Sequence, residues 1–131
     1  MMIIIRMILN AHPEKHLEVL QTLLSLMKPV RKEPGCRSCC AFYDIDDKNH
    51  FTLLQEWETP KDMNNHIQSL QFGVLLGIKT LLSEPPRIRI HTVSKTWGMD
   101  AVQALRQQKG DRKSTRLNSS HIPLSRMPSS A

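Results

Sequence analysis

The order in which apolar residues change their spacing constrains the fold of this chain more than any single residue does. In four short segments apolar side chains alternate with polar ones or fill both sets of positions, which predicts strands. These segments are Ile3–Asn10, Cys36–Ile45, His50–Trp57 and Arg87–Val93. After the first and third segments, apolar residues recur three and four positions apart, which predicts helices. The polar turn at Asp46–Asn49 joins the second and third strands as a hairpin.

The predicted order is strand, helix, strand, strand, helix, strand, which is the split βαβ or ferredoxin-like pattern of the α+β class. We expect an antiparallel sheet with both helices on one face and the other face open. The open face needs a partner, because we assign to it apolar residues such as Ile5, Phe42 and Leu53. Arg6 interrupts the apolar first strand, and it either extends into solvent at a sheet edge or lines a pocket.

The helix boundaries follow from prolines and capping residues. The first helix is predicted to begin at His12–Glu14 and to be kinked or ended by Pro29. Its buried stripe is expected to comprise Leu17, Leu20, Leu23, Leu24 and Met27. The second helix begins where Thr59 can cap it and Pro60 suits its first position, and helical structure is expected to continue through Phe72–Ser83. One face of this helix carries Met63, His66, Ile67 and Leu70.

The candidate site lies where the third strand runs into the second helix. Histidine titrates near neutrality, so His66 could take a proton from a phenol or hydroquinone, or it could be a hydrogen-bonded core residue. Trp57 could stack on a planar substrate or fill the corner between strand and helix. Glu56 could orient His66 or cap the helix that follows.

Two motifs of the chain resemble those of the antibiotic biosynthesis monooxygenase family, which includes quinol monooxygenases. The family's E-W…H…S…F signature is similar to the series Glu56, Trp57, His66, Ser69 and Phe72. Its R-x-E-P-G-C motif, at the entry to the second strand, is similar to RKEPGC at Arg31–Cys36. The resemblance spans roughly Met2 to Val93, nearly the whole of one domain.

The resemblance implies a homodimer in which two sheets close a dimeric α+β barrel. It implies oxidation of a small quinol or polycyclic phenol by O2, without flavin, haem or metal cofactor. His66 would be the base, with Glu56 as a second catalytic residue. The substrate would contact Trp57, Phe72 and Arg6. Because the deprotonated substrate itself would reduce oxygen, the protein need only deprotonate, orient and exclude water.

Two further functions stay open at this point. One is an isomerase of a small carbonyl compound, which needs the same base but consumes no oxygen, and the other is a non-catalytic ligand-binding dimer. A buried, fully hydrogen-bonded His66 would favour the binding protein, whereas a pocket-facing one would favour catalysis. Haem-degrading relatives use an asparagine near the position of Arg6 and a histidine late in the second helical region. Gly73–Thr80 contains no histidine, which argues against haem degradation.

The three cysteines include a C-x-x-C spacing on a predicted strand. Strand alternation would place Cys36 and Cys40 on one face and Cys39 on the other, so we expect no shared metal ion. The chain has three cysteines in all, so no second pair can complete a zinc site. The sequence also shows no Gly-rich phosphate loop and no Walker motif.

We interpret residues 111–131 as a non-native, disordered tail. Asp111–His121 and Ser125–Ala131 resemble the translation of a common sequencing adapter, and a genuine Ser-rich disordered extension is the alternative. This tail carries four basic residues and one acid, so its removal would lower the net charge from +6 to +3. The case for nucleic-acid binding mostly disappears with it.

We divide the chain into a domain at 1–95, an extension at 96–110 and the tail at 111–131. The extension is expected to hold a short helix at Met99–Arg106, and the native C-terminus is expected beyond Gly110. No apolar run is long enough to span a membrane, and Ile3–Ile5 lacks the cleavage site of a signal peptide. These features predict a cytoplasmic protein without a membrane partner.

Overall fold

The structure is a computed structural model that describes residues 1–110. It divides into two units, of which the first is Met1–Ser94 and the second begins at Lys95. In the second unit the described residues form helix α4 (Met99–Gly110), which confirms a helix here and extends it past the predicted end at Arg106. The predicted tail at 111–131 lies outside the described residues, and the three-part division of the chain stays a prediction.

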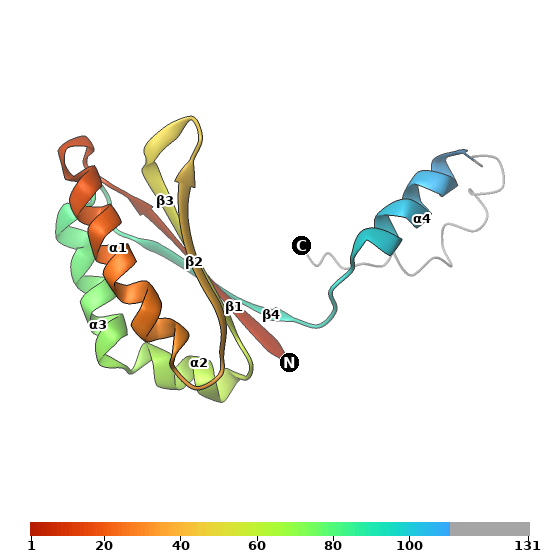
Figure 1. The fold of residues 1–131 in the computed structure, drawn as a ribbon, viewed down its shortest axis with the longest axis horizontal. Helices are drawn as coiled ribbons and strands as arrows, with labels where there is room; N and C mark the ends of the chain where they lie inside the picture. The colour runs from red at the N-terminus through yellow and green to blue at the C-terminus, as the bar shows by residue number, and fades with distance from the viewer. Residues whose placement is uncertain (111–131) are drawn as a thin grey trace. The chain divides into compact units, whose positions relative to one another are not determined.

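The first unit is built on a four-stranded antiparallel sheet in the order β2-β3-β1-β4 (Figure 1). The strands are β1 (Met2–Asn10), β2 (Cys36–Asp44), β3 (Asp47–Trp57) and β4 (Arg87–Val93). All four predicted strands are present, and the sheet has the predicted ferredoxin-like topology. β1 is a central strand because it pairs with both β3 and β4, so Arg6 is not the edge residue that one interpretation of the sequence required.

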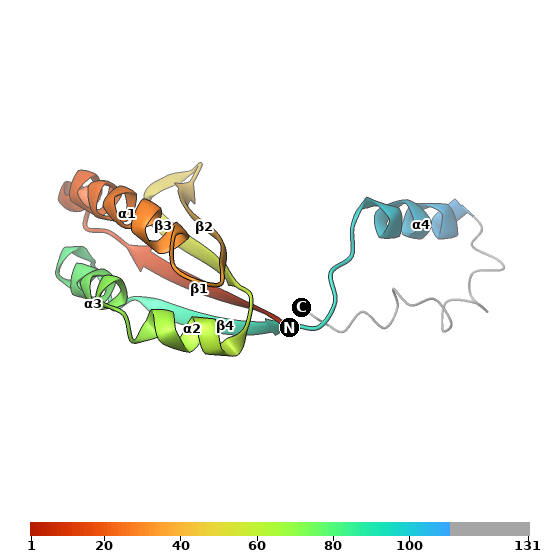
Figure 2. The same cartoon turned by 60° about the horizontal axis from the view of Figure 1, so that its bottom comes forward.

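Helices cover one face of this sheet (Figures 1 and 2). A short 3-10 turn, η1 (Pro13–Lys15), leads into α1 (His16–Arg31), and Pro29 does not end that helix. The second helical region consists of α2 (Pro60–Ile67), α3 (Leu70–Leu76) and a 3-10 segment, η2 (Gly77–Leu81). No helix among residues 1–110 is long and apolar enough to cross a membrane.

Two predictions about the helix faces were wrong. Leu17 and Leu24 are exposed, because the buried side of α1 is set by the residues Val19, Leu23 and Val30. Leu70 is 83% exposed, because helix α2 ends before it. The Ser69 hydroxyl accepts a hydrogen bond from the backbone N–H of Phe72 (3.2 Å) and starts a new helix with a different orientation.

The core lies between the helices and the covered face of the sheet. β1 contributes Ile3, Ile5, Met7 and Leu9 to it, because alternate residues of a strand share a face. Ile5 and Leu53 pack in this core, so their assignment to the open face was wrong; they point toward the helices. Phe42 does belong to the open face and is 50% exposed.

Candidate functional site

His66 reaches the core because helix α2 begins where the sequence predicted. The Thr59 hydroxyl accepts a hydrogen bond from the backbone N–H of Asp62 (3.1 Å), and Pro60 occupies the first helical position. From this start, the helical period turns His66 inward, and its side chain is 1% exposed. The imidazole is therefore inside the covered side of the sheet.

The two nitrogen atoms of His66 have different surroundings. Nδ1 lies 2.9 Å from Oε1 of Glu33, and since a carboxylate only accepts hydrogen bonds, Nδ1 is the donor. Nε2 is buried and has no hydrogen-bond partner among residues 1–110. This arrangement directs the second nitrogen, which carries the lone pair when the ring is neutral, away from Glu33 and leaves it available for a proton.

Aromatic rings fix the orientation of the imidazole. The ring of Trp57 stacks on His66 with centroids 4.5 Å apart, and Phe72 meets it edge-on at 5.4 Å. Trp57 and Phe72 are themselves buried, and the indole N–H of Trp57 donates to Oε1 of Gln55 (3.1 Å). The structure thus brings together three of the predicted site residues, His66, Trp57 and Phe72.

Glu33 is held by the loop between α1 and β2. Gly35 in this loop has φ of 82°, and a Cβ there would collide with the side chain of Asp62. The carbonyl of Gly35 accepts a hydrogen bond from the backbone N–H of Glu58 (2.8 Å). These contacts fasten the loop to the start of α2, and they explain how Glu33 meets His66 across a separation of 33 residues.

Glu56 does not take the role that the sequence analysis gave it. It lies opposite Ile4 of β1, on the open face, whereas Trp57 points toward the helices. Strand alternation places consecutive residues on opposite faces, so a carboxylate next to Trp57 cannot also reach His66. The hydrogen-bonded partner is Glu33, and its signal was already present in the R-x-E-P-G-C motif.

Only a small cavity adjoins His66. Its volume is about 10 Å³, which is room for about one water molecule, and its lining includes Gln55 and Gln71. A larger hollow of about 290 Å³ lies between α1 and the β2–β3 hairpin, where the aromatic residues Tyr43 and Phe51 line it. Leu23 and Met27 line both spaces, so these two side chains separate them.

Arg6 lies apart from these residues. It is exposed on the open face, where Arg6, Ile8, His50, Arg87 and Arg89 line a separate hollow of about 240 Å³. The structure therefore does not bring Arg6 together with His66, because the sheet stands between them. The sequence predicted the alternation of β4. It did not predict that Arg87 and Arg89 would line the same hollow as Arg6.

The cysteine prediction was wrong in one respect. An irregularity between Cys36 and Ser38 shifts the register of β2, so that Cys36 lies opposite Trp57 and Cys39 opposite Gln55. Cys36 and Cys39 thus share the covered face, and Cys40 lies on the other. Burial and the neighbouring Cys36 raise the pKa of Cys39 to about 11, so its thiol is neutral at physiological pH. Residues 1–110 contain no cluster of three or more metal-binding side chains.

Comparison with known proteins agrees with this architecture. The structure of Rv0793 from Mycobacterium tuberculosis has a TM-score of 0.68 at 16% identity, and the alignment covers 75% of this chain and 100% of that one. A conserved protein of Methanosarcina mazei Go1 has a TM-score of 0.65 at 24% identity, with 69% and 90% covered. An antibiotic biosynthesis monooxygenase has a TM-score of 0.65 at 22% identity, with 72% and 100% covered. These three likenesses establish a shared fold.

Curated proteins give no match. The sequence model of one family, described as antibiotic biosynthesis monooxygenase, matches residues 1–75. That range includes β1, α1, the β2–β3 hairpin and α2, and with them His66, Glu33 and Trp57. The chain belongs to the antibiotic biosynthesis monooxygenase family.

Proposed function

We propose that this protein is a cofactor-independent monooxygenase that oxidises a small quinol or polycyclic phenol with O2, with His66 as the base. Membership of the family supports a monooxygenase-like role that acts on a small molecule. The observation that carries the finer proposal is the asymmetry of His66, whose Nδ1 is held by Glu33 while Nε2 has no partner in the part of the chain that the structure describes. A base needs one nitrogen fixed and the other available.

In the proposed reaction the protein supplies a base and holds that base in place. Nε2 of His66 takes the proton of a phenolic hydroxyl, and Glu33 stabilises the imidazolium that results. The electron-rich anion then transfers electrons to O2; one oxygen atom enters the substrate and the other leaves as water. Trp57 and Phe72 keep the imidazole in one orientation throughout, because both rings pack directly on it.

The substrate reaches His66 from the hollow beneath α1. Aromatic side chains there offer stacking surfaces for a planar ring, and the hollow of about 290 Å³ is close to the lower end of small-molecule sites. Leu23 and Met27 stand between this hollow and His66. Met27 is the side chain that yields, because its unbranched thioether is flexible and its contact with the Cys39 thiol is weak (3.8 Å).

One observation favours a second function. The cavity at His66 has a volume of only about 10 Å³, which suits a ligand-binding dimer that holds an aromatic molecule in the outer hollow without turnover. In that case His66 and Glu33 serve the stability of the fold alone. The homodimer itself is part of both proposals, and the exposed Phe42 on the open face supports it.

Oxygen consumption by the purified full chain tests the monooxygenase. We expect uptake with at least one compound of a panel of hydroquinones and polycyclic phenols, and a loss of about 100-fold or more in His66→Gln. His91→Gln is the matched control, because His91 is exposed on the open face, and it is expected to retain full activity. Sedimentation of the same samples reports the dimer.

Three outcomes would contradict the proposal in different ways. Uptake that survives in His66→Gln would remove His66 from the reaction. Turnover of a carbonyl compound without oxygen uptake would identify an isomerase. Saturable binding of aromatic compounds without any turnover would identify the ligand-binding dimer, with the hollow beneath α1 as its site.

A further inference from the structure

We propose that Gln55 is a further catalytic residue, whose side-chain amide donates a hydrogen bond to the substrate oxygen that His66 deprotonates. The inference rests on the proposed function and deepens it, because it adds to the base a group that stabilises the anion. Gln55 of β3 lies opposite Ile5 of β1 and is 1% exposed, so its side chain is buried on the covered face. The amide and the imidazole of His66 line the same small cavity.

Trp57 fixes the orientation of the Gln55 amide. The two residues are two positions apart on β3 and share a face, and the indole N–H donates to Oε1 of Gln55 (3.1 Å). Because an indole N–H can only donate, the atom that it contacts is the amide oxygen, and the amide nitrogen takes the other position. The two N–H groups of Gln55 are therefore directed away from the indole.

Cys39 shows on which side the amide nitrogen lies. It stands opposite Gln55 on β2, and both side chains line the cavity at His66. Burial is the main effect on the pKa of the Cys39 thiol and raises it, whereas a hydrogen bond with the side chain of Gln55 acts to lower this pKa. A donor has that lowering effect, so an N–H of Gln55 faces Cys39. A neutral thiol is a weak acceptor, which leaves this N–H available to a stronger one.

The cavity has the size of one hydroxyl group. Its volume is about 10 Å³, enough for about one water molecule, so only the hydroxyl of a phenol enters it while the ring stays where Met27 has moved aside. That hydroxyl then lies between the imidazole of His66 and the amide of Gln55. Gln71 also lines the cavity, but it is only partly buried, and water competes for its amide.

The two groups have complementary roles in the deprotonation. The O–H bond of the phenol breaks, the proton passes to Nε2 of His66, and the oxygen keeps the electron pair. Gln55 then donates to an oxygen that carries negative charge, and a hydrogen bond to a charged acceptor is roughly twice as strong as one to a neutral acceptor. The interaction is thus stronger after proton transfer than before it, which is the property that accelerates a reaction.

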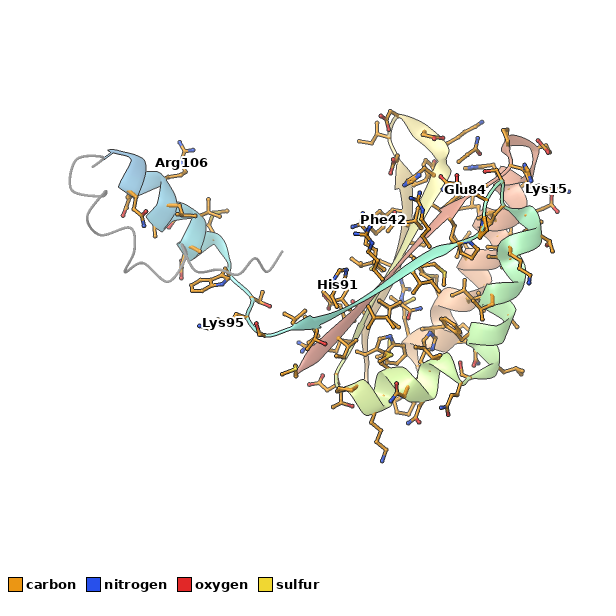
Figure 3. All side chains as sticks on the ribbon, turned by 180° about the vertical axis from the view of Figure 1, so that it is seen from behind. Lys15, Phe42, Glu84, His91, Lys95 and Arg106 are labelled. Atoms are coloured by element: carbon orange, nitrogen blue, oxygen red, sulfur yellow. The ribbon has the colours of Figure 1, made fainter. Side chains whose placement is uncertain are left out.

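The site is separate from the open face of the sheet. Figure 3 views the molecule from behind, and the labelled Phe42 and His91 point away from the helices. Gln55 lies on the side that the helices cover, where residues of α1 and α3 line the cavity with it. A second copy that packs on the open face therefore leaves the cavity as it is.

The ionisation of 4-nitrophenol bound to the full chain tests the assignment without turnover, because the phenolate of this probe absorbs visible light. We expect the acid dissociation constant of the bound probe to fall about tenfold or more in Gln55→Met, since a donor to the charged form is lost. Gln21→Met is the matched control. It makes the same change at an exposed position of α1 and should leave that constant unchanged.

A second background distinguishes this role from a structural one. Gln55→Met leaves the indole N–H of Trp57 unpaired, whereas Trp57→Phe removes that donor and keeps an aromatic ring against His66. If Gln55 served only to hold Trp57, Gln55→Met would have no further effect in the Trp57→Phe background. We expect the same fall of about tenfold there. Urea unfolding shows that each variant is folded.

Oxygen uptake by the same variants separates this inference from the proposed function. We expect kcat to fall about 100-fold in Gln55→Met, with a smaller change in the KM for the phenol. Probe ionisation that depends on Gln55 without any oxygen uptake would keep Gln55 as the donor to a bound phenolate and overturn the monooxygenase. An unchanged dissociation constant in folded Gln55→Met would overturn the inference, and so would an equal fall in Gln21→Met or a folded parent that does not bind the probe.

Discussion

The two faces of the sheet differ in whether their polar side chains have partners within the described residues. On the covered face, buried His66 has Glu33 and buried Gln55 has the indole N–H of Trp57, each within 3.1 Å. On the open face, Arg6 and Arg89 stand directly opposite each other without a carboxylate partner among the described residues. Adjacent residues of one strand, Ile5 and Arg6, therefore belong to two different environments.

The difference follows from the cost of removing polar groups from water. A buried polar group without a partner costs on the order of 1–3 kcal/mol, so the hydrogen bonds of His66 Nδ1 and Gln55 stabilise the covered face and fix its geometry. Nε2 of His66 and Oε2 of Glu33 are buried without a partner among the described residues, and the lone pair of Nε2 makes it the candidate for chemistry. On the open face of a single copy, water solvates the unpaired charges, so they cost less than unpaired groups on the covered face.

Replacement of an aromatic residue on each face should show the largest contrast. Trp57→Ala is expected to lower the free energy of unfolding by roughly 3–5 kcal/mol, because it empties a fully buried site and removes the stacking on His66. Phe42→Ala should cost only about 1 kcal/mol, because half of that side chain is already exposed. Urea unfolding of both variants measures the contrast, and equal losses would mean that Phe42 is buried in solution.

Replacement of one glutamate on each face tests the pairing itself. Glu33→Gln keeps the shape but removes the charge that faces His66, and it is expected to cost about 1–2 kcal/mol. Glu56→Gln makes the same change on the open face and should stay within about 0.5 kcal/mol of the parent. A large loss in Glu56→Gln, measured by the same unfolding experiment, would show that this carboxylate has a partner on the open face.

The sequence predicted the parts of the fold that depend on local rules. The strands and the cap at Thr59 follow from the alternation of apolar residues and from the chemistry of a single hydroxyl, and the structure confirms them. The break at Ser69 is also local, but the spacing of Met63, His66 and Leu70 agreed equally well with one continuous helix. The hydroxyl of Ser69 predicts a new helix, whereas the apolar spacing predicts one continuous helix. The structure has the new helix.

The parts that the sequence did not predict depend on distant residues. Glu33 reaches His66 only because the loop at Gly35 packs on Asp62, and spacing alone favoured the nearer Glu56. The register shift after Cys36 likewise reverses the faces that strict alternation assigns to the cysteines. The resemblance contained the missing information about Glu33, since this residue is part of the R-x-E-P-G-C motif.

The smallest expected change in the free energy of unfolding is on the open face. There a substitution should raise stability, whereas substitutions on the covered face lower it. In phosphate-free buffer of low ionic strength, Arg89→Gln should raise the free energy of unfolding by about 0.2–1 kcal/mol, because it removes a like charge directly opposite Arg6. The gain should disappear near 1 M salt, where charges are screened within a few ångströms, roughly 3 Å. Arg37→Gln is the control, since it loses a bridge to Glu58 and should give no gain. A loss of stability in Arg89→Gln would mean that the arginines already have a partner in solution. Both faces would then pair their polar groups, and they would differ only in where the partner lies.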